Sequence, residues 1–257
     1  MSHLNPEQEK FVKALRSFPK ETQKPDPQEK EWSKYYNLYE ALRGLGDTFL
    51  GYYGRFMYNP ISMLRKGDYY LLGINPGFKK DRKEDYTFLR DEIREWGEDK
   101  KLAYHAMVKE HWDTDFQESV KALWRKIDRD LGELCASNLY FCSSTAEKKM
   151  PSLSEHEKNA CLSVHKAVLE IIEPKCILVF STGEEKYSMV LNSLDGLHEE
   201  EGLGPDACKC RVAVGEYKNR PTMLVGIPYP NYGKQLTNHP EVVTEIAKKC
   251  HEFIANH

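Results

Sequence analysis

The fold is decided by the stretch Tyr69-Tyr70-Leu71-Leu72-Gly73-Ile74-Asn75-Pro76-Gly77. Its first half is apolar and has the length of a buried strand, and glycine, proline and glycine then end it. In open α/β sheets, ligands bind in the crevice outside the carboxyl ends of the strands. Asn75 therefore lies where chemistry is usually done. The same residue types also form ordinary strand-ending turns, and this stretch alone favours such a turn.

The composition is that of a soluble globular protein with one sizeable core. The chain has 257 residues, an apolar fraction of 40% and a net charge of −3. It has no apolar run of about 18 residues, the length that a transmembrane helix needs. The N-terminus lacks the basic and apolar regions of a signal peptide. We therefore expect a cytoplasmic protein that does not bind membranes, whereas protein partners cannot be inferred.

The cysteines predict neither disulfides nor a metal site. There are seven, an odd number, and several lie in apolar segments, where free thiols behave as small hydrophobic side chains. Cys208 and Cys210 are one residue too close for the usual zinc or redox spacing. We expect no metal and no cofactor. A nucleophilic Cys142 remains an alternative, although no base for it stands out nearby.

Hydrophobic periodicity divides the chain into helices and strands. Helices are expected over 5–16, 29–44, 115–134, 154–172, 182–194 and 240–254, and core strands over 69–74, 136–141, 176–181 and 222–227. Ser154 with Glu157, and Thr182 with Glu185, have the spacing of capping boxes. Residues 211–217 are expected to pair with 222–227 as a hairpin, and residues 195–209 to form an acidic loop.

This alternation predicts an α/β fold. Apolar strands separated by helices favour right-handed crossovers and a buried, mainly parallel sheet. We expect a three-layer α/β/α sandwich around a four-stranded sheet. Residues 1–45 are expected to be a helical extension and linker, and residues 46–257 the main domain.

Basic and aromatic side chains follow several of the predicted strands. The lysines concerned are Lys79, Lys80, Lys148, Lys149 and Lys234. A basic, aromatic rim at the strand ends suits a polyanion whose bases can stack, such as DNA. For any single lysine, a solvated surface charge is the simpler interpretation.

Together these residues resemble the uracil-DNA glycosylase superfamily, with the mismatch-specific and single-strand-selective branches as the nearest relatives. Gly73-Ile74-Asn75-Pro76-Gly77 resembles that group's first active-site motif, and Asn138 falls where the group has its uracil-recognising asparagine. Pro228-Tyr229-Pro230-Asn231-Tyr232 resembles the second motif. The similarity extends over residues 65–254. Tyr229-Pro230-Asn231 stands where the second motif usually begins with His-Pro or Asn-Pro, a difference that bears on leaving-group stabilisation.

The resemblance implies a DNA glycosylase-type hydrolase that flips uracil, or a related damaged or mismatched base, out of DNA. Asn75 would orient the attacking water, Asn138 would read the pyrimidine edge, and Tyr229 or Asn231 would contact the base. The remaining residues implied in base binding are Gly73, Ile74, Pro76, Gly77, and Phe78 or Phe88 as the stacking ring. Leu236 would wedge into the duplex, and the five lysines would hold phosphates.

Two other functions stay open from the sequence. The first is a non-catalytic nucleobase- or DNA-binding module on the same fold, which the altered second motif would suit. The second is a hydrolase that uses Cys142 with His156 or His165 as its base. Those histidines lie on a predicted helix, where surface or packing roles are the more common ones.

Overall fold

The computed structural model describes residues 4–16, 18, 33–59, 61–74, 77–78, 87–96, 115–129, 134–145, 153–228 and 236–257. The chain divides into two compact units. The first comprises Met1–Arg65, Asn75–Tyr104 and Ser137–Ile172, and the second comprises Lys66–Ile74, His105–Ala136 and Glu173–His257. Residues 1–45 thus belong to a larger unit, and no division between the two units falls at the expected boundary after residue 45.

A six-stranded mixed sheet has the strand order β3-β1-β5-β8-β7-β6. Its strands are β1 (Tyr69–Gly73), β3 (Cys135–Asn138), β5 (Cys176–Val179), β6 (Leu197–Leu203), β7 (Cys210–Tyr217) and β8 (Arg220–Gly226). β1 pairs with β5, and β5 with β8, in parallel. Both β1 and β5 are buried along their whole length, which explains their continuous apolar sequence. The α/β class is confirmed.

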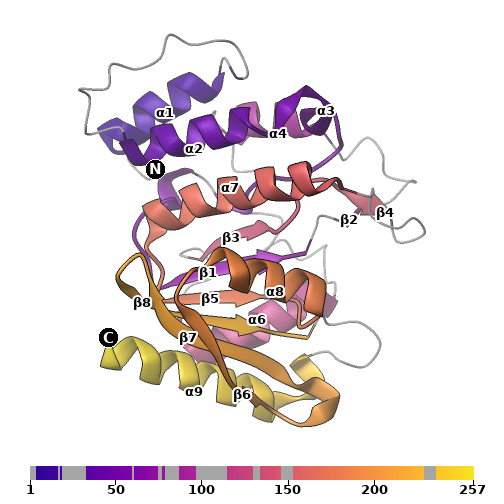
Figure 1. Ribbon diagram of the computed structural model, residues 1–257, viewed down its shortest axis with the longest axis vertical. Helices are drawn as coiled ribbons and strands as arrows, with labels where there is room; N and C mark the ends of the chain where they lie inside the picture. The colour runs from indigo at the N-terminus through magenta and orange to yellow at the C-terminus, as the bar shows by residue number, and fades with distance from the viewer. Residues whose placement is uncertain are drawn as a thin grey trace. The chain divides into compact units, whose positions relative to one another are not determined.

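The expectation of four strands is wrong, because the sheet continues beyond β8. The predicted hairpin forms, with β7 antiparallel to β8, and β6 then pairs antiparallel with β7 (Figure 1). β6 occupies much of the segment expected to be an acidic loop. Its side chains are mostly exposed, so its sequence carries none of the apolar alternation that reveals a half-buried strand. The glutamates of this edge strand are charges of the kind that discourage further pairing.

Three helices of the second unit pack with this sheet. They are α6 (Asp115–Ile127), α8 (Glu184–Ser193) and α9 (Pro240–Asn256), close to the predicted ranges. α9 contacts α6, β6 and β8. The fully buried Tyr187 brings α8 onto β8 at Gly226, where a Cβ atom would lie 2.5 Å from the tyrosine ring. Gly226 therefore permits the close approach of helix and strand.

The first unit is mainly helical. Its elements are α1 (Pro6–Arg16), α2 (Ser33–Arg43), α3 (Gly46–Leu50), the 3-10 turn η2 (Ile61–Met63), α4 (Leu89–Trp96), α7 (Glu155–Ile172) and two short strands, β2 (Gly77–Phe78) and β4 (Ser144–Thr145). α2 packs along α7, and α1 packs on α2 and α4 (Figure 1). Buried aromatic rings fill the contacts of α1, with Phe11 5.5 Å from Tyr35 and 5.7 Å from Trp96 between ring centroids.

Of the two predicted capping boxes, one forms. At the start of α7, the backbone N–H of Ser154 donates to the Glu157 carboxylate at 2.8 Å, and the Glu157 N–H donates to the Ser154 hydroxyl. The second prediction is wrong. α8 begins after Gly183, which has extended backbone angles and supplies no side-chain cap, so Thr182 lies one residue too early.

Candidate functional site

The end of β3 is held by a segment just before η2. Met57 and Ser137 form an antiparallel bridge, and the Ser137 hydroxyl donates to the Phe56 carbonyl at 2.5 Å. Further along, the Arg55 N–H donates to the Phe141 carbonyl at 2.9 Å. These bonds fix the backbone on both sides of Asn138, the last residue of β3.

The Asn138 carboxamide is buried, with 2% of the residue exposed. Its Nδ2 donates to the phenolic oxygen of Tyr58 at 2.6 Å. Among the described residues, this is the one hydrogen bond given for the carboxamide, and its oxygen and its second N–H have no other partner among them. Buried polar groups are normally paired. An unpaired amide edge at a strand end is therefore suited to a planar ligand that offers both a donor and an acceptor.

His165 of α7 supports the same backbone from the helix side. It is 4% exposed, its Nε2 lies 3.1 Å from the Leu139 carbonyl oxygen, and its ring packs against Phe141. Burial lowers the pKa of His165 from 6.5 to about 4, although the carbonyl contact acts in the opposite direction. The ring is therefore neutral near pH 7 and donates Nε2–H to the carbonyl, which has no hydrogen of its own.

The loops that follow β1 and β3 meet in the first unit. Gly77 and Phe78 pair in parallel with Ser144 and Thr145, as β2 and β4. The two loops are thus joined through their backbones.

An aromatic pair lies close to these loops along the chain. The rings of Tyr53 and Phe88 are stacked, with centroids 4.7 Å apart and planes 14° apart. Tyr53 also accepts a backbone hydrogen bond from Ser143, next to β4. Phe88 is 45% exposed, so one face of its ring is covered by Tyr53 and the rest is open. It remains a candidate for stacking on a base.

Cys142 does not have the properties of a nucleophile. The residue is fully buried, and burial raises the pKa of its thiol to about 11. The reactive form of cysteine is the thiolate, so this site would be almost wholly protonated near pH 7. His165, one of the two bases considered for it, already contacts the Leu139 carbonyl. We therefore do not pursue the thiol hydrolase alternative.

Some of the predicted site residues lie in the described part of the chain, and others lie outside it. Gly73 is buried and Ile74 half-buried at the end of β1. Gly77 and Phe78 are placed by their backbone alone. The remaining predicted residues lie outside the described residues: Asn75, Pro76, Lys79, Lys80, Lys148, Lys149, Tyr229, Asn231 and Lys234.

Leu236 requires a correction. It was expected to project from a loop as a wedge, but it begins the 3-10 turn η6 (Leu236–Asn238) and is fully buried. η6 contacts both α6 and α9, and an apolar side chain in such a position contributes to the core. We no longer assign Leu236 to DNA.

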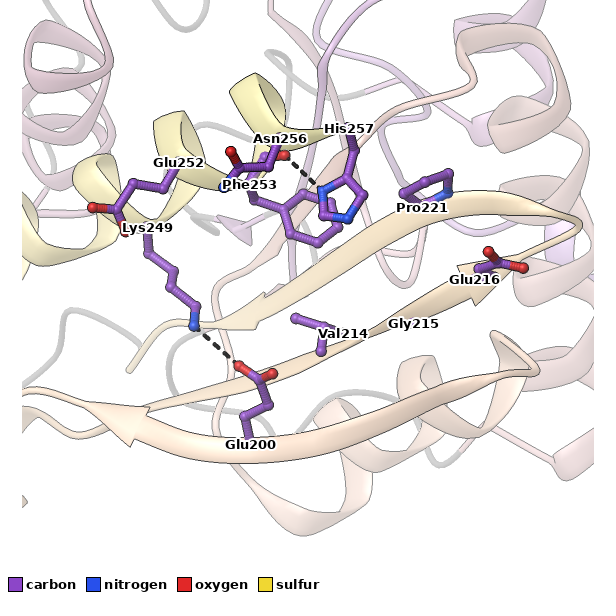
Figure 2. Close-up of a pocket in the computed structure, with 10 residues that line it drawn as sticks. All are labelled: Glu200, Val214, Gly215, Glu216, Pro221, Lys249, Glu252, Phe253, Asn256 and His257. Atoms are coloured by element: carbon purple, nitrogen blue, oxygen red, sulfur yellow. Dashed lines mark hydrogen bonds and ion pairs between the residues drawn. The ribbon is translucent and has the colours of Figure 1, made fainter.

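The second unit has a pocket of about 410 Å³ beside the C-terminal half of α9. Figure 2 shows its lining, in which Lys249 lies 3.0 Å from Glu200 and His257 contacts the Phe253 carbonyl. Its charged lining residues are exposed or half-buried, and none of the predicted site residues lines it. We read its contacts as packing between α9 and the sheet.

Two general properties follow from the residues that the structure describes. No group of three or more of their histidine, cysteine, aspartate and glutamate side chains is arranged to hold a metal ion. Nor does any helix among them have the length and apolar character needed to span a membrane.

Tyr58 was not among the residues predicted from the sequence, whereas His165 has the packing role that was the more common expectation for it. Tyr58 lies in a stretch with no periodic pattern, and its partner Asn138 is 80 residues away. No local signal could have linked the two. For His165 there was a signal, because it follows the buried Val164 and precedes the buried Ala167 and Val168 on α7.

No protein-family model matches this chain, and no curated protein sequence is similar to it at a significant level.

Proposed function

We propose that the protein is a DNA glycosylase-type hydrolase that removes uracil, or a related damaged or mismatched base, from DNA. The observation that carries the proposal is the buried Asn138 carboxamide at a strand end, whose oxygen and second N–H have no partner among the residues that the structure describes. The resemblance of residues 73–77 to the first motif of the superfamily supports it. The three-layer α/β/α arrangement typical of that superfamily is part of the same proposal.

In this proposal, Asn138 recognises the flipped base. Its oxygen accepts from the N–H at position 3 of uracil, and its second N–H donates to the neighbouring carbonyl. The base must leave the duplex to reach a buried amide, which costs a few kcal/mol of unstacking and unpairing. Phe78 or Phe88 supplies the ring that stacks on it.

In the proposed reaction, Asn75 orients the water molecule that attacks the sugar. The oxygen of the water bonds to the sugar carbon C1′ while the glycosidic bond breaks and its electron pair leaves on the base. Positive charge on the sugar and negative charge on the base develop together. Backbone N–H groups near Asn75 and after β8 stabilise the departing anion, with Tyr229 or Asn231 in contact with it. The proton released by the water passes to solvent, because a neutral amide cannot accept it, and solvent returns one proton to the departing base.

DNA is held through its phosphates. Lys79, Lys80, Lys148, Lys149 and Lys234 provide the positive charge in this scheme. Affinity for DNA should therefore fall steeply with salt, because each neutralised phosphate releases counterions. A logarithmic plot of affinity against salt concentration that stays flat would contradict phosphate binding.

The proposed activity is tested with oligonucleotides that contain one uracil, either as a single strand or as a mismatched duplex. After incubation with the protein, alkali breaks the strand wherever a base has been removed. We expect breaks with the wild type and none with Asn75→Ala or Asn138→Ala. Asn159→Ala is the control, because Asn159 is exposed on α7 and should leave the breaks unchanged. Equal breakage by Asn75→Ala would remove Asn75 from the mechanism. Binding of uracil without release would favour the non-catalytic binding module.

A further inference from the structure

β6 is the last strand of the six-stranded sheet, and its outer side has no strand beside it among the residues that the structure describes. It runs for seven residues, Leu197–Leu203, and pairs with β7 along its inner side. A strand in this position presents a row of N–H and C=O groups to which another extended chain can bond. Recognition by strand addition uses such an edge, because hydrogen bonds of the main chain supply the affinity.

The edge is held firmly from both faces of the sheet. Successive side chains of a strand point to opposite faces. On one face, the Glu199 carboxylate accepts two hydrogen bonds from the Arg211 guanidinium of β7, at 2.8 and 2.9 Å. On the other face, the Glu200 carboxylate lies 3.0 Å from the Lys249 ammonium of α9 (Figure 2). A strand that is already in place binds an incoming chain without first having to become ordered.

Negative charge is concentrated on and beside this strand. Residues 184–206 carry seven acidic side chains and one lysine, whereas the net charge of the whole chain is −3, so the rest of the chain is net positive. All seven acidic residues are exposed: Glu184, Glu185, Asp195, Glu199, Glu200, Glu201 and Asp206. Arg211 and Lys249 neutralise part of this charge, but Glu201 has no ion pair with any described residue.

The sign of the charge decides which chain can bind. A second copy of the protein would bring an identical acidic edge against this one, and like charges directly opposite each other destabilise strand pairing. DNA is a polyanion, so the same carboxylates repel it. An extended segment that carries lysine or arginine is attracted, because its basic side chains meet carboxylates on both faces of the sheet. The glutamates therefore discourage self-pairing and leave the edge open to a strand of opposite charge.

We infer that β6 is a docking edge for a basic, extended segment of another protein, which adds to the sheet beside it. The main chain of β6 provides the hydrogen bonds, and the three consecutive glutamates at 199–201 provide the preference for a basic sequence. The inference does not depend on the proposed function, and all the residues that carry it belong to the second unit.

The test uses the whole chain and a fluorescently labelled peptide with blocked ends and the sequence Lys-Val-Lys-Val-Lys-Val-Lys. A second peptide has the same sequence with a methyl group on every backbone nitrogen, which removes its N–H donors and keeps its charge. Dissociation constants are measured by fluorescence anisotropy for the wild type, Glu201→Lys and Glu9→Lys. Glu9→Lys is the matched control, because Glu9 is exposed on α1 in the first unit and its substitution changes the net charge equally.

We expect the wild type and Glu9→Lys to bind the unmodified peptide equally and the methylated peptide far more weakly. Glu201→Lys should raise the dissociation constant about fivefold, because an attraction at the edge becomes a repulsion. Equal binding of the two peptides would overturn the inference, since charge alone would then explain it. The inference would also be overturned if neither peptide binds, if Glu9→Lys loses as much affinity as Glu201→Lys, or if the wild type instead dimerises through β6 in sedimentation experiments.

Discussion

At the scale of single residues, the neutral form of His165 has a consequence for stability. Its pKa in the folded protein, about 4, lies below the ordinary value of 6.5, so the folded state binds this proton more weakly than the unfolded chain does. The resulting stabilisation is complete above pH 6.5 and is lost as the pH falls toward 4. A shift of this size corresponds to roughly 3 kcal/mol.

We therefore predict that His165→Gln flattens the decline in stability between pH 6.5 and 4. Glutamine keeps an N–H donor for the Leu139 carbonyl but does not titrate. Urea unfolding midpoints at several pH values measure the effect. His251→Gln is the control, because the exposed His251 ring also lies near a backbone carbonyl, that of Ile127, and its loss should leave the decline as it is. The prediction fails if the decline in His165→Gln matches that of the wild type.

Asn138 and Tyr58 matter through their hydrogen bond rather than through a titration. Neither is an acidic or basic residue type, so neither stands out by charge. Their significance comes from the burial of Asn138 together with an amide edge that has no further partner among the described residues. For this reason the proposed function depends on hydrogen-bond geometry, and the variants that test it remove single polar groups.

At the scale of elements, the contribution of the capping box of α7 to stability can be measured with one substitution. Ser154→Ala removes the hydroxyl that receives the Glu157 N–H, and should lower the free energy of unfolding by about 1 kcal/mol. Chemical denaturation of the purified variant would show it.

Ser163→Ala provides the comparison within the same helix. The exposed Ser163 hydroxyl bonds back to the Asn159 carbonyl, and alanine is the better helix former, so the change should be near neutral. Equal effects of the two substitutions would show that the cap contributes nothing beyond helix propensity.

The edge strand β6 illustrates how far elements can be predicted. The apolar runs of β1, β5 and β8 predict buried strands because every side chain in such a strand needs an apolar neighbour. β6 has exposed glutamates on most of its length and is held by its backbone pairing with β7. Backbone hydrogen bonds are available to any sequence, and therefore leave no pattern to read.

At the scale of the whole molecule, the cysteines report on the integrity of both units. All seven are free and buried, and they are distributed over both units of the fold. Burial raises the pKa of Cys142 to about 11 and that of Cys161 and of Cys210 to about 12. Thiolates should therefore be scarce and shielded in the folded protein.

We predict that a chromogenic disulfide reagent finds almost no thiols in the native protein and seven after unfolding in guanidinium. The time course of labelling measures how often each unit opens. Cys142→Ala should lower the unfolded total by one and leave the native reading unchanged. Rapid labelling of Cys142 in the native protein would contradict this and restore the thiol hydrolase as a candidate.

The sequence by itself determined the α/β class, the ranges of most helices, and the place of Asn138 within a buried strand. These features depend on the periodicity of neighbouring side chains, which a sequence displays directly. The tertiary structure alone decided the six-stranded order of the sheet, the burial of Leu236 and the pairing of Tyr58 with Asn138. Each of these depends on contacts between residues far apart along the chain, and such contacts are chosen by packing and hydrogen bonding after the local elements have formed.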